Sequence, residues 1–168
     1  MMDSGAGLLG PTDLGHTRLP LDVPADTLSA GGELLAAAHA RRAYISVLLI
    51  EDDDADAYLI EHALHTLPHI REVFRARDGV EALDMIDRQK LRPDLALVDL
   101  RMPRKDGMSV LAELDARILA NFPAVVLTSS RSPVDVYRAG KRGAWKYLTK
   151  QNTIPRMARS LKRIIAAL

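Results

Sequence analysis

Short, purely apolar runs alternate with amphipathic segments along most of the chain, and this alternation limits the folds it can adopt. The runs are typical of buried strands, and the segments between them carry apolar residues at helical spacing. We expect strands at residues 45–50, 72–76, 95–98, 124–127 and 144–148, and helices at 55–67, 80–89, 108–119, 134–141 and 154–167. Strands that are apolar throughout belong to parallel sheets covered by helices on both faces. The pattern predicts an α/β fold with a doubly wound, five-stranded parallel sheet.

A different texture precedes this alternation. Residues 1–43 are rich in glycine, proline and small polar residues, and strong helix formers occur together only at 33–42. Such a segment cannot bury enough apolar surface to offset the entropy of ordering. We therefore expect a largely disordered tail at 1–43 with a short helix at 33–42, followed by one domain over residues 44–168.

The composition excludes several classes of protein. The chain contains no cysteine, which rules out disulfides, thiol nucleophiles and cysteine zinc sites. No apolar run approaches the roughly 20 residues that a membrane-spanning helix requires. The first residues also lack the basic start of a signal peptide. We expect a cytoplasmic protein that has no membrane partner.

Polar side chains follow the expected strands at the point where each strand ends. They are Glu51 to Asp54, Asp99, Thr128 to Ser130, Thr149 and Lys150. The carboxyl ends of the strands face one crevice in a doubly wound sheet, so these side chains should meet there. Carboxylates from adjacent strands repel one another unless a cation neutralises them, and an all-oxygen cluster suits Mg²⁺ or Mn²⁺. One of these acids, Asp53 or Asp54, has the simpler role of capping the next helix.

The motifs at these strand ends resemble those of the receiver domains of two-component response regulators. They are VLLIEDD at the first strand, VDLRMPRKDG at the third, VVLTS at the fourth and YLTK at the fifth. The resemblance covers about residues 45–168 and implies a flavodoxin-like sheet with strand order 2-1-3-4-5. It also implies a stand-alone response regulator, not an enzyme, that accepts a phosphoryl group from a sensor histidine kinase or phosphotransfer protein.

The resemblance assigns the acidic residues their roles. It implies that Asp99 is the phosphoacceptor. It implies that Asp52, Asp99 and the backbone carbonyl of Arg101 bind Mg²⁺ (or Mn²⁺), and that Glu51 acts on the cation through a water. These roles agree with the general chemistry of phosphoryl transfer, which depends on positioning and on neutralising charge.

Thr128, Tyr147 and Lys150 complete the implied site. Thr128 and Lys150 would contact phosphoryl oxygens, and Thr128 with Tyr147 would form a switch in which the tyrosine rotates inward. Gln151 departs from the family pattern, because most receivers have a proline there after a cis bond, and Asn152 replaces a commonly apolar residue. A cis bond before a non-proline residue costs about 2.5 to 4 kcal/mol. A trans bond would hold Lys150 slightly differently, and the sequence leaves the form of this bond open.

Charge is segregated along the chain, although the formal net charge is only +1. Residues 131–168 hold ten basic residues and one acidic residue, a net +9, whereas residues 44–130 hold ten and sixteen, a net −6. In receivers the last segment supplies the fourth helix, fifth strand and fifth helix, the usual signalling surface. We expect a downstream protein partner with an acidic surface on this basic C-terminal face. DNA binding is not expected, and a homodimer remains open.

Two other functions remain open. A phosphohydrolase of the haloacid-dehalogenase type would need a second aspartate two residues after its nucleophile, where this chain has Arg101. A receiver-like interaction module that no longer uses phosphorylation would keep the same fold. The departures at Gln151 and Asn152 leave this module open, whereas the intact set of reactive residues argues against it.

Overall fold

Five parallel strands form one sheet in the computed structural model, which describes residues 44–117 and 122–168. The strands are β1 (Ile45–Ile50), β2 (Ile70–Ala76), β3 (Leu95–Val98), β4 (Ala124–Thr128) and β5 (Lys146–Thr149). Their order is β2-β1-β3-β4-β5, which confirms the predicted flavodoxin-like, doubly wound sheet. The tail expected at 1–43, with its helix at 33–42, lies outside the described residues.

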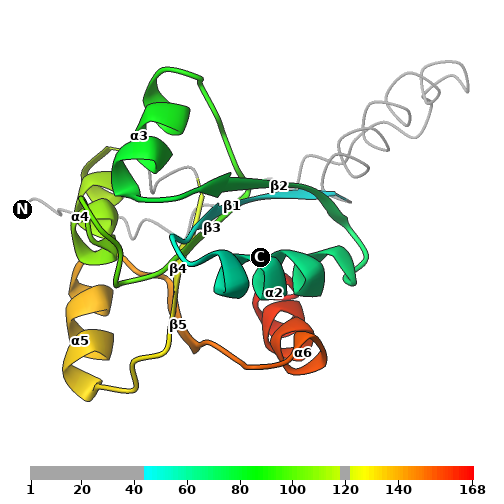
Figure 1. Cartoon of the computed structure of the whole chain (residues 1–168). Coiled ribbons are helices and arrows are strands. Elements are labelled where there is room, and N and C mark those ends of the chain that lie inside the picture. The colour runs from blue at the N-terminus through cyan, green and yellow to red at the C-terminus, as the bar shows by residue number, and fades with distance from the viewer. Residues whose placement is uncertain (1–43, 118–121) are drawn as a thin grey trace, which may run out of the picture. The chain divides into compact units, whose positions relative to one another are not determined.

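Helices cover both faces of this sheet (Figure 1). They are α2 (Asp54–His65), α3 (Gly79–Asp87), α4 (Gly107–Arg117), α5 (Pro133–Lys141) and α6 (Ile154–Ile165). Helices α3, α4 and α5 pack on one face, and α2 and α6 pack on the other. Within the described residues, no helix combines the length and apolarity that crossing a bilayer requires.

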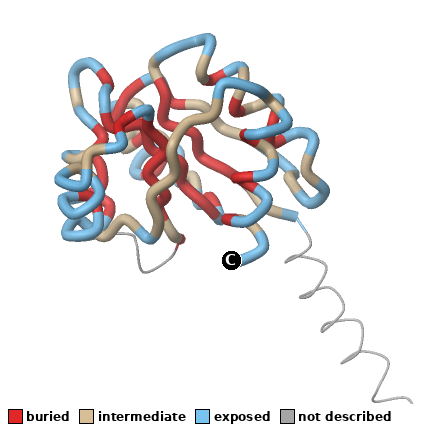
Figure 2. The backbone as a smooth tube through the Cα atoms, turned by 90° about the horizontal axis from the view of Figure 1, so that it is seen from below, coloured by how far each residue is buried: buried red, intermediate tan, exposed pale blue. Residues whose placement is uncertain are grey.

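The alternation of side chains along each strand builds two separate hydrophobic cores. In β1, Leu48 and Ile50 join the core under α3 and α4, while Val47 and Leu49 join the core under α2 and α6. Figure 2 shows the result, with buried strands at the centre and exposed backbone around them. Burying each such side chain contributes about 1.5 to 3 kcal/mol. The two cores hold the strand ends in fixed positions.

Aspartate caps define where the helices next to the strand ends begin. Asp53 is the N-cap of α2, and its side chain accepts hydrogen bonds from the amides of Ala55 and Asp56. Asp78 caps α3 in the same way. The prediction that Asp53 or Asp54 caps the first helix is confirmed, and the cap fixes the first turn of α2 beside the end of β1.

Strand β4 extends one residue beyond the prediction, to Thr128, and two other strands differ from the prediction more. Strand β2 begins at Ile70 rather than at residue 72, and β5 spans Lys146–Thr149 rather than 144–148. Both are edge strands of the sheet, and their mixed polar and apolar side chains give a weaker signal than the buried runs. Trp145 therefore precedes β5 and is 39% exposed.

Candidate functional site

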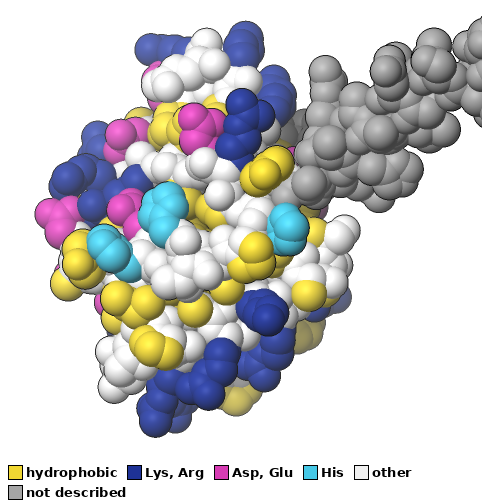
Figure 3. Space-filling model, turned by 90° about the vertical axis from the view of Figure 1, so that its right-hand side faces the viewer, with side chains coloured by type: hydrophobic (Ala, Val, Ile, Leu, Met, Phe, Trp, Pro, Cys, Tyr) yellow, Lys and Arg dark blue, Asp and Glu magenta, His cyan; other side chains and the backbone are white. Residues whose placement is uncertain are grey.

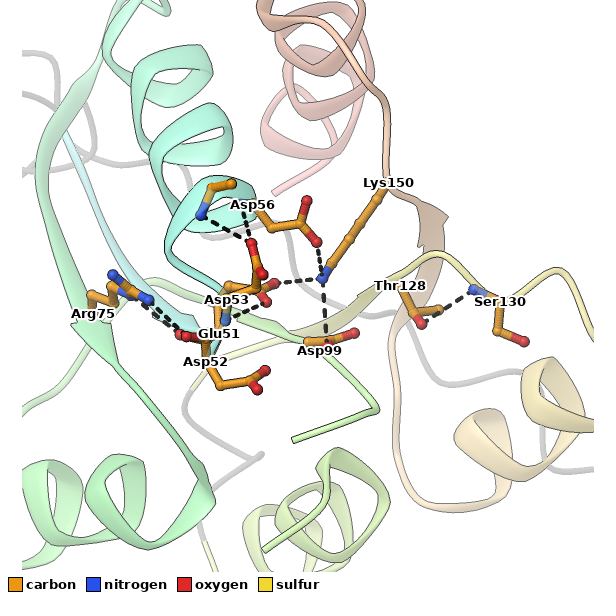
Figure 4. Close-up of polar contacts among 10 residues, drawn as sticks. Glu51, Asp52, Asp53, Asp56, Arg75, Asp99, Thr128, Ser130 and Lys150 are labelled. Carbon is orange, nitrogen blue, oxygen red and sulfur yellow. Dashed lines mark hydrogen bonds and ion pairs between the residues drawn. The ribbon is translucent and has the colours of Figure 1, made fainter. Parts of the chain in front are cut away.

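A pocket of about 260 Å³ lies at the carboxyl ends of the strands. Its lining residues are Glu51, Asp52, Asp53, Asp56, Asp99, Arg101, Thr128, Ser129 and Lys150. Figure 4 shows the side chains of Glu51, Asp56 and Asp99 converging on Lys150. The expected metal and phosphoryl-transfer residues all line this pocket, whereas the expected switch residue Tyr147 does not. Three other polar residues that the sequence placed at the same crevice also lie outside the lining, namely Asp54, Ser130 and Thr149.

Three carboxylates meet in the pocket from two neighbouring strands. One oxygen from each of Glu51, Asp52 and Asp99 lies within 4.8 Å of the others. Glu51 is only 1% exposed, and its Oε2 lacks a well-directed hydrogen bond from any described residue, although Lys150 Nζ is 2.7 Å away. A buried oxygen in this condition, beside two further carboxylates, fits a divalent cation. The residues present therefore suit the metal that the sequence predicts.

Burial changes the acidity of two of these carboxyl groups. Loss of hydration raises the pKa of Glu51 from 4.5 to about 7, even though Lys150 acts to lower it. Burial also raises the pKa of Asp99, against the lowering effects of Lys150 and of the amides of Leu100 and Arg101. A cation in the cluster would favour the charged carboxylates.

Lys150 is the cationic centre of the pocket. Its Nζ lies 2.7 Å from Glu51 Oε2, 2.8 Å from Asp56 Oδ2 and 3.5 Å from Asp99 Oδ2. Burial by itself would lower the pKa of Lys150, but its hydrogen bond to Asp56, its ion pair with Glu51 and the nearby Asp99 raise it above its usual value. The lysine is therefore a fixed positive charge between three carboxylates.

The loop from β3 to α4 passes close to the backbone of Asp99. The amide of Gly107 donates to the carbonyl of Leu100 at 3.2 Å. A Cβ atom at position 107 would lie 2.0 Å from the carbonyl oxygen of Asp99, so only glycine fits there. Asp106 accepts a hydrogen bond from the Ser109 amide at 2.8 Å, at the start of α4. These contacts fix the end of the loop whose first residues, Asp99 and Arg101, line the pocket.

Comparison with known protein families identifies the family to which this chain belongs. A model of the response regulator receiver domain matches residues 47–162. The chain belongs to the response regulator receiver domain family. Receiver domains are phosphorylated on aspartate, interact with histidine kinases or phosphotransfer proteins, and are generally not enzymes.

Known receiver proteins resemble this chain over most of its length. Response regulator Rcp1 of Synechocystis sp. is 37% identical over 114 residues, which are 64% of this chain and 78% of Rcp1. The Mn²⁺-bound crystal structure of Rcp1 aligns with a TM-score of 0.64 and 33% identity, covering 71% of this chain and 91% of that chain. The phosphorylated cyanobacterial phytochrome response regulator RcpA gives 0.65 and 36%, covering 73% and 91%. The acidic cluster of this receiver fits divalent-metal binding of the kind named for Rcp1.

The two residues expected to form the switch lie on neighbouring strands of the receiver. Thr128 is 1% exposed, and its Oγ1 accepts a hydrogen bond from the Ser130 amide at 3.3 Å. The hydroxyl of Tyr147 donates to the backbone carbonyl of Ser130 at 3.1 Å. Burial raises the pKa of Tyr147. Both side chains thus contact the backbone of Ser130, in the loop that follows β4.

The Lys150–Gln151 peptide bond of this receiver is trans, and the described residues contain no cis bond. The amide of Lys150 donates to the carbonyl of Thr128 at 2.9 Å, and Gln151 Nε2 donates to the carbonyl of Thr149 at 3.0 Å. The bond that the sequence left open is therefore trans, and Lys150 still reaches the pocket.

Two polar residues of the site were not expected from the sequence. Asp56 binds Lys150, and Arg75 donates to the carbonyls of Glu51 and Asp52 at 3.1 and 3.2 Å. Arg75 also pairs with Asp54 at 2.7 Å. The acidic run after β1 was a signal for Asp56, since the first turn of a helix that follows a strand lies at the crevice. Arg75 had no comparable signal, because an arginine on an edge strand usually faces solvent.

Proposed function

We propose that this receiver domain accepts a phosphoryl group on Asp99 from the phosphohistidine of a sensor histidine kinase or phosphotransfer protein. It then signals to a downstream protein by direct contact, in a cytoplasmic setting. The observation that carries this proposal is the position of Asp99, 7% exposed at its side chain, beside two carboxylates and an ammonium in one small pocket.

The residues divide the chemistry between them. A carboxylate oxygen of Asp99 forms the new P–O bond while the P–N bond of the phosphohistidine breaks and its electron pair returns to the imidazole nitrogen. Lys150, 3.5 Å from Asp99 Oδ2, balances charge on the transferred group. Thr128 accepts a hydrogen bond from the Ser130 amide, and its hydroxyl proton can donate to a phosphoryl oxygen. Phosphoryl transfer requires mainly such positioning.

The acidic cluster is the proposed site of Mg²⁺ or Mn²⁺. Asp52, Asp99 and the backbone carbonyl of Arg101 would hold the cation, and Glu51 would act through a water. When bound, the cation supplies neutralisation of the negative charge on the phosphoryl oxygens. The buried carboxylate of Glu51 and the carboxylates beside it support this assignment.

Thr128 and Tyr147 are the proposed switch. A phosphoryl group on Asp99 adds acceptor oxygens that would draw the Thr128 hydroxyl toward the pocket. The Ser130 loop would shift with it, because Thr128 and Tyr147 both bond to Ser130. Tyr147 would then rotate inward and change the surface formed by α5, β5 and α6.

That surface is the proposed contact for a downstream partner. A groove of about 460 Å³ on α6 is lined by Gln151, Arg156, Arg159, Ser160 and Arg163. Figure 3 shows basic side chains gathered on the lower part of the face it displays. Gln151 directly follows Lys150, so the groove adjoins the loop that carries the active-site lysine. The positive charge favours an acidic partner surface.

The test of phosphoryl acceptance is a mass measurement. After incubation with Mg²⁺ and acetyl phosphate, wild type should gain the mass of one phosphoryl group and Asp99→Asn should gain none. Asp84 is a half-buried aspartate that pairs with Arg88 outside the pocket, so Asp84→Asn is the matched control and should be modified like wild type. If wild type stays unmodified by acetyl phosphate and by cognate kinases, the phosphorylation-independent module is correct instead.

A phosphohydrolase would turn over phosphate esters, and Arg101 in place of the second aspartate disfavours that outcome.

A further inference from the structure

Asp56 is the partner of Lys150 that no role in phosphoryl transfer accounts for. We propose that Asp56 is a positioning residue that holds Lys150 back from Asp99 before phosphorylation and thereby slows phosphoryl gain. This inference rests on the proposed function. Its basis is the geometry of Figure 4, in which Lys150 reaches toward Asp56 of α2 as well as toward the two strand-end carboxylates.

The distances show that Lys150 lies closer to Asp56 than to Asp99. Lys150 Nζ hydrogen-bonds Asp56 Oδ2 at 2.8 Å, whereas Asp99 Oδ2 is 3.5 Å away. An ammonium has three donors, and Asp56 occupies one of them. For Lys150 to follow the phosphoryl oxygens on Asp99, this contact has to lengthen or break. The free energy of the Lys150–Asp56 contact therefore opposes the step in which the lysine engages the phosphoryl group.

The place of Asp56 in the fold is set locally. The Asp53 side chain accepts hydrogen bonds from the amides of Ala55 and Asp56, so the cap fixes the backbone of Asp56 in the first turn of α2. That turn lies beside the end of β1, and Asp56 lines the same pocket as Asp99. Contact between residues 94 positions apart in the chain thus follows from one helix cap and the parallel sheet.

Asp56 and Glu51 differ in how easily they can release the lysine. The Glu51 side chain is 1% exposed, so water cannot replace Lys150 as its partner, whereas the Asp56 side chain is 43% exposed and can be rehydrated. Leaving a buried charge unpaired is costly, and leaving a hydrated charge unpaired is not. Asp56 is therefore the exchangeable partner of Lys150, and Glu51 is the permanent one.

The test separates phosphoryl gain from phosphoryl loss. Asp56→Asn should raise the rate of phosphorylation by acetyl phosphate about two- to fivefold, the range expected for one half-exposed ion pair. Hydrolysis of the aspartyl phosphate should change less than about twofold, since Lys150 is already engaged in that starting state. Asp56→Glu keeps the carboxylate and should restore a rate close to wild type. Glu61→Gln removes the same charge from α2 five residues later and should match wild type.

A second readout does not depend on phosphorylation. At constant pH and without phosphodonor, the NMR signals of the Lys150 ammonium group and its Cε should shift in Asp56→Asn and stay unchanged in Glu61→Gln. Unchanged Lys150 signals, or gain and loss rates that fall together, would overturn the positioning role. Failure of wild type to accept any phosphoryl group would instead reject the proposed function, and the NMR comparison would still decide whether Asp56 holds the lysine.

Discussion

The strand-end pocket and the outer face of α6 are both rich in charge, but they use it in opposite ways. In the pocket, Lys150 is 9% exposed and within 3.5 Å of three carboxylates. On α6, three exposed arginines line a groove, and none forms an ion pair with any residue in 44–117 or 122–168. Charges interact strongly where water is excluded and weakly where it is not. The pocket charges therefore act on one another, while the α6 charges are available to a partner.

The largest effect is expected on removing the cation of the pocket. Lys150→Met leaves Glu51 and Asp99 buried without their positive partner, which should lower the free energy of unfolding by about 3 kcal/mol at pH 8. Lys162→Met removes an exposed lysine from α6 and should change it by less than about 0.5 kcal/mol. Urea unfolding followed by circular dichroism measures both. Equal losses in the two variants would show that the pocket and the α6 face do not differ energetically.

The free energy of unfolding should also depend on pH, because the buried Glu51 side chain in the pocket titrates. Its pKa rises from 4.5 to about 7 on folding, so between these values the folded state holds a proton that the unfolded state has released. Stability should therefore fall as pH increases through this window, by about 3 kcal/mol in total.

Glu51→Gln is the control for that titration. The variant cannot lose a proton at position 51, so its metal-free stability curve should be flatter between pH 4.5 and 7. Unfolding curves at several pH values, in the presence of a chelator, measure the difference. Parallel curves for wild type and the variant would mean that another group is responsible.

Some parts of the fold and of the site could be predicted from the sequence, and others could not. The buried strands were predictable because purely apolar runs are typical of strands covered on both faces. Polar residues at the carboxyl ends of such strands, for example Asp99 and Thr128, were predictable because those ends face one crevice. The contact between Asp56 and Lys150 was not, because it depends on the direction of a helix turn and on a loop after another strand. The ends of β2 and β5 were also missed, since edge strands mix polar and apolar residues.

A divalent cation should sharpen the difference between the two regions further. With the chelator removed, Mg²⁺ at about 100 times its dissociation constant should stabilise the fold by about 2.7 kcal/mol. Asp52→Asn removes one carboxylate of the cluster and should abolish most of this gain. Asp84→Asn, on α3, should keep it. Thermal unfolding with and without Mg²⁺ measures the gain, and an equal response of the two variants would place the cation elsewhere.

Substitutions on the α6 face should have the smallest effect on stability. They should affect binding to an acidic partner more than they affect folding. Replacing Arg156, Arg159 and Arg163 by glutamate should change the free energy of unfolding by less than about 0.5 kcal/mol for each exposed residue. Binding to an immobilised acidic peptide should weaken strongly at low salt and less at physiological salt, where exposed charges are screened. Arg71→Glu, an exposed arginine on β2, is the single-substitution control for Arg159→Glu. If both single variants weaken binding equally, net charge rather than the α6 groove determines the interaction.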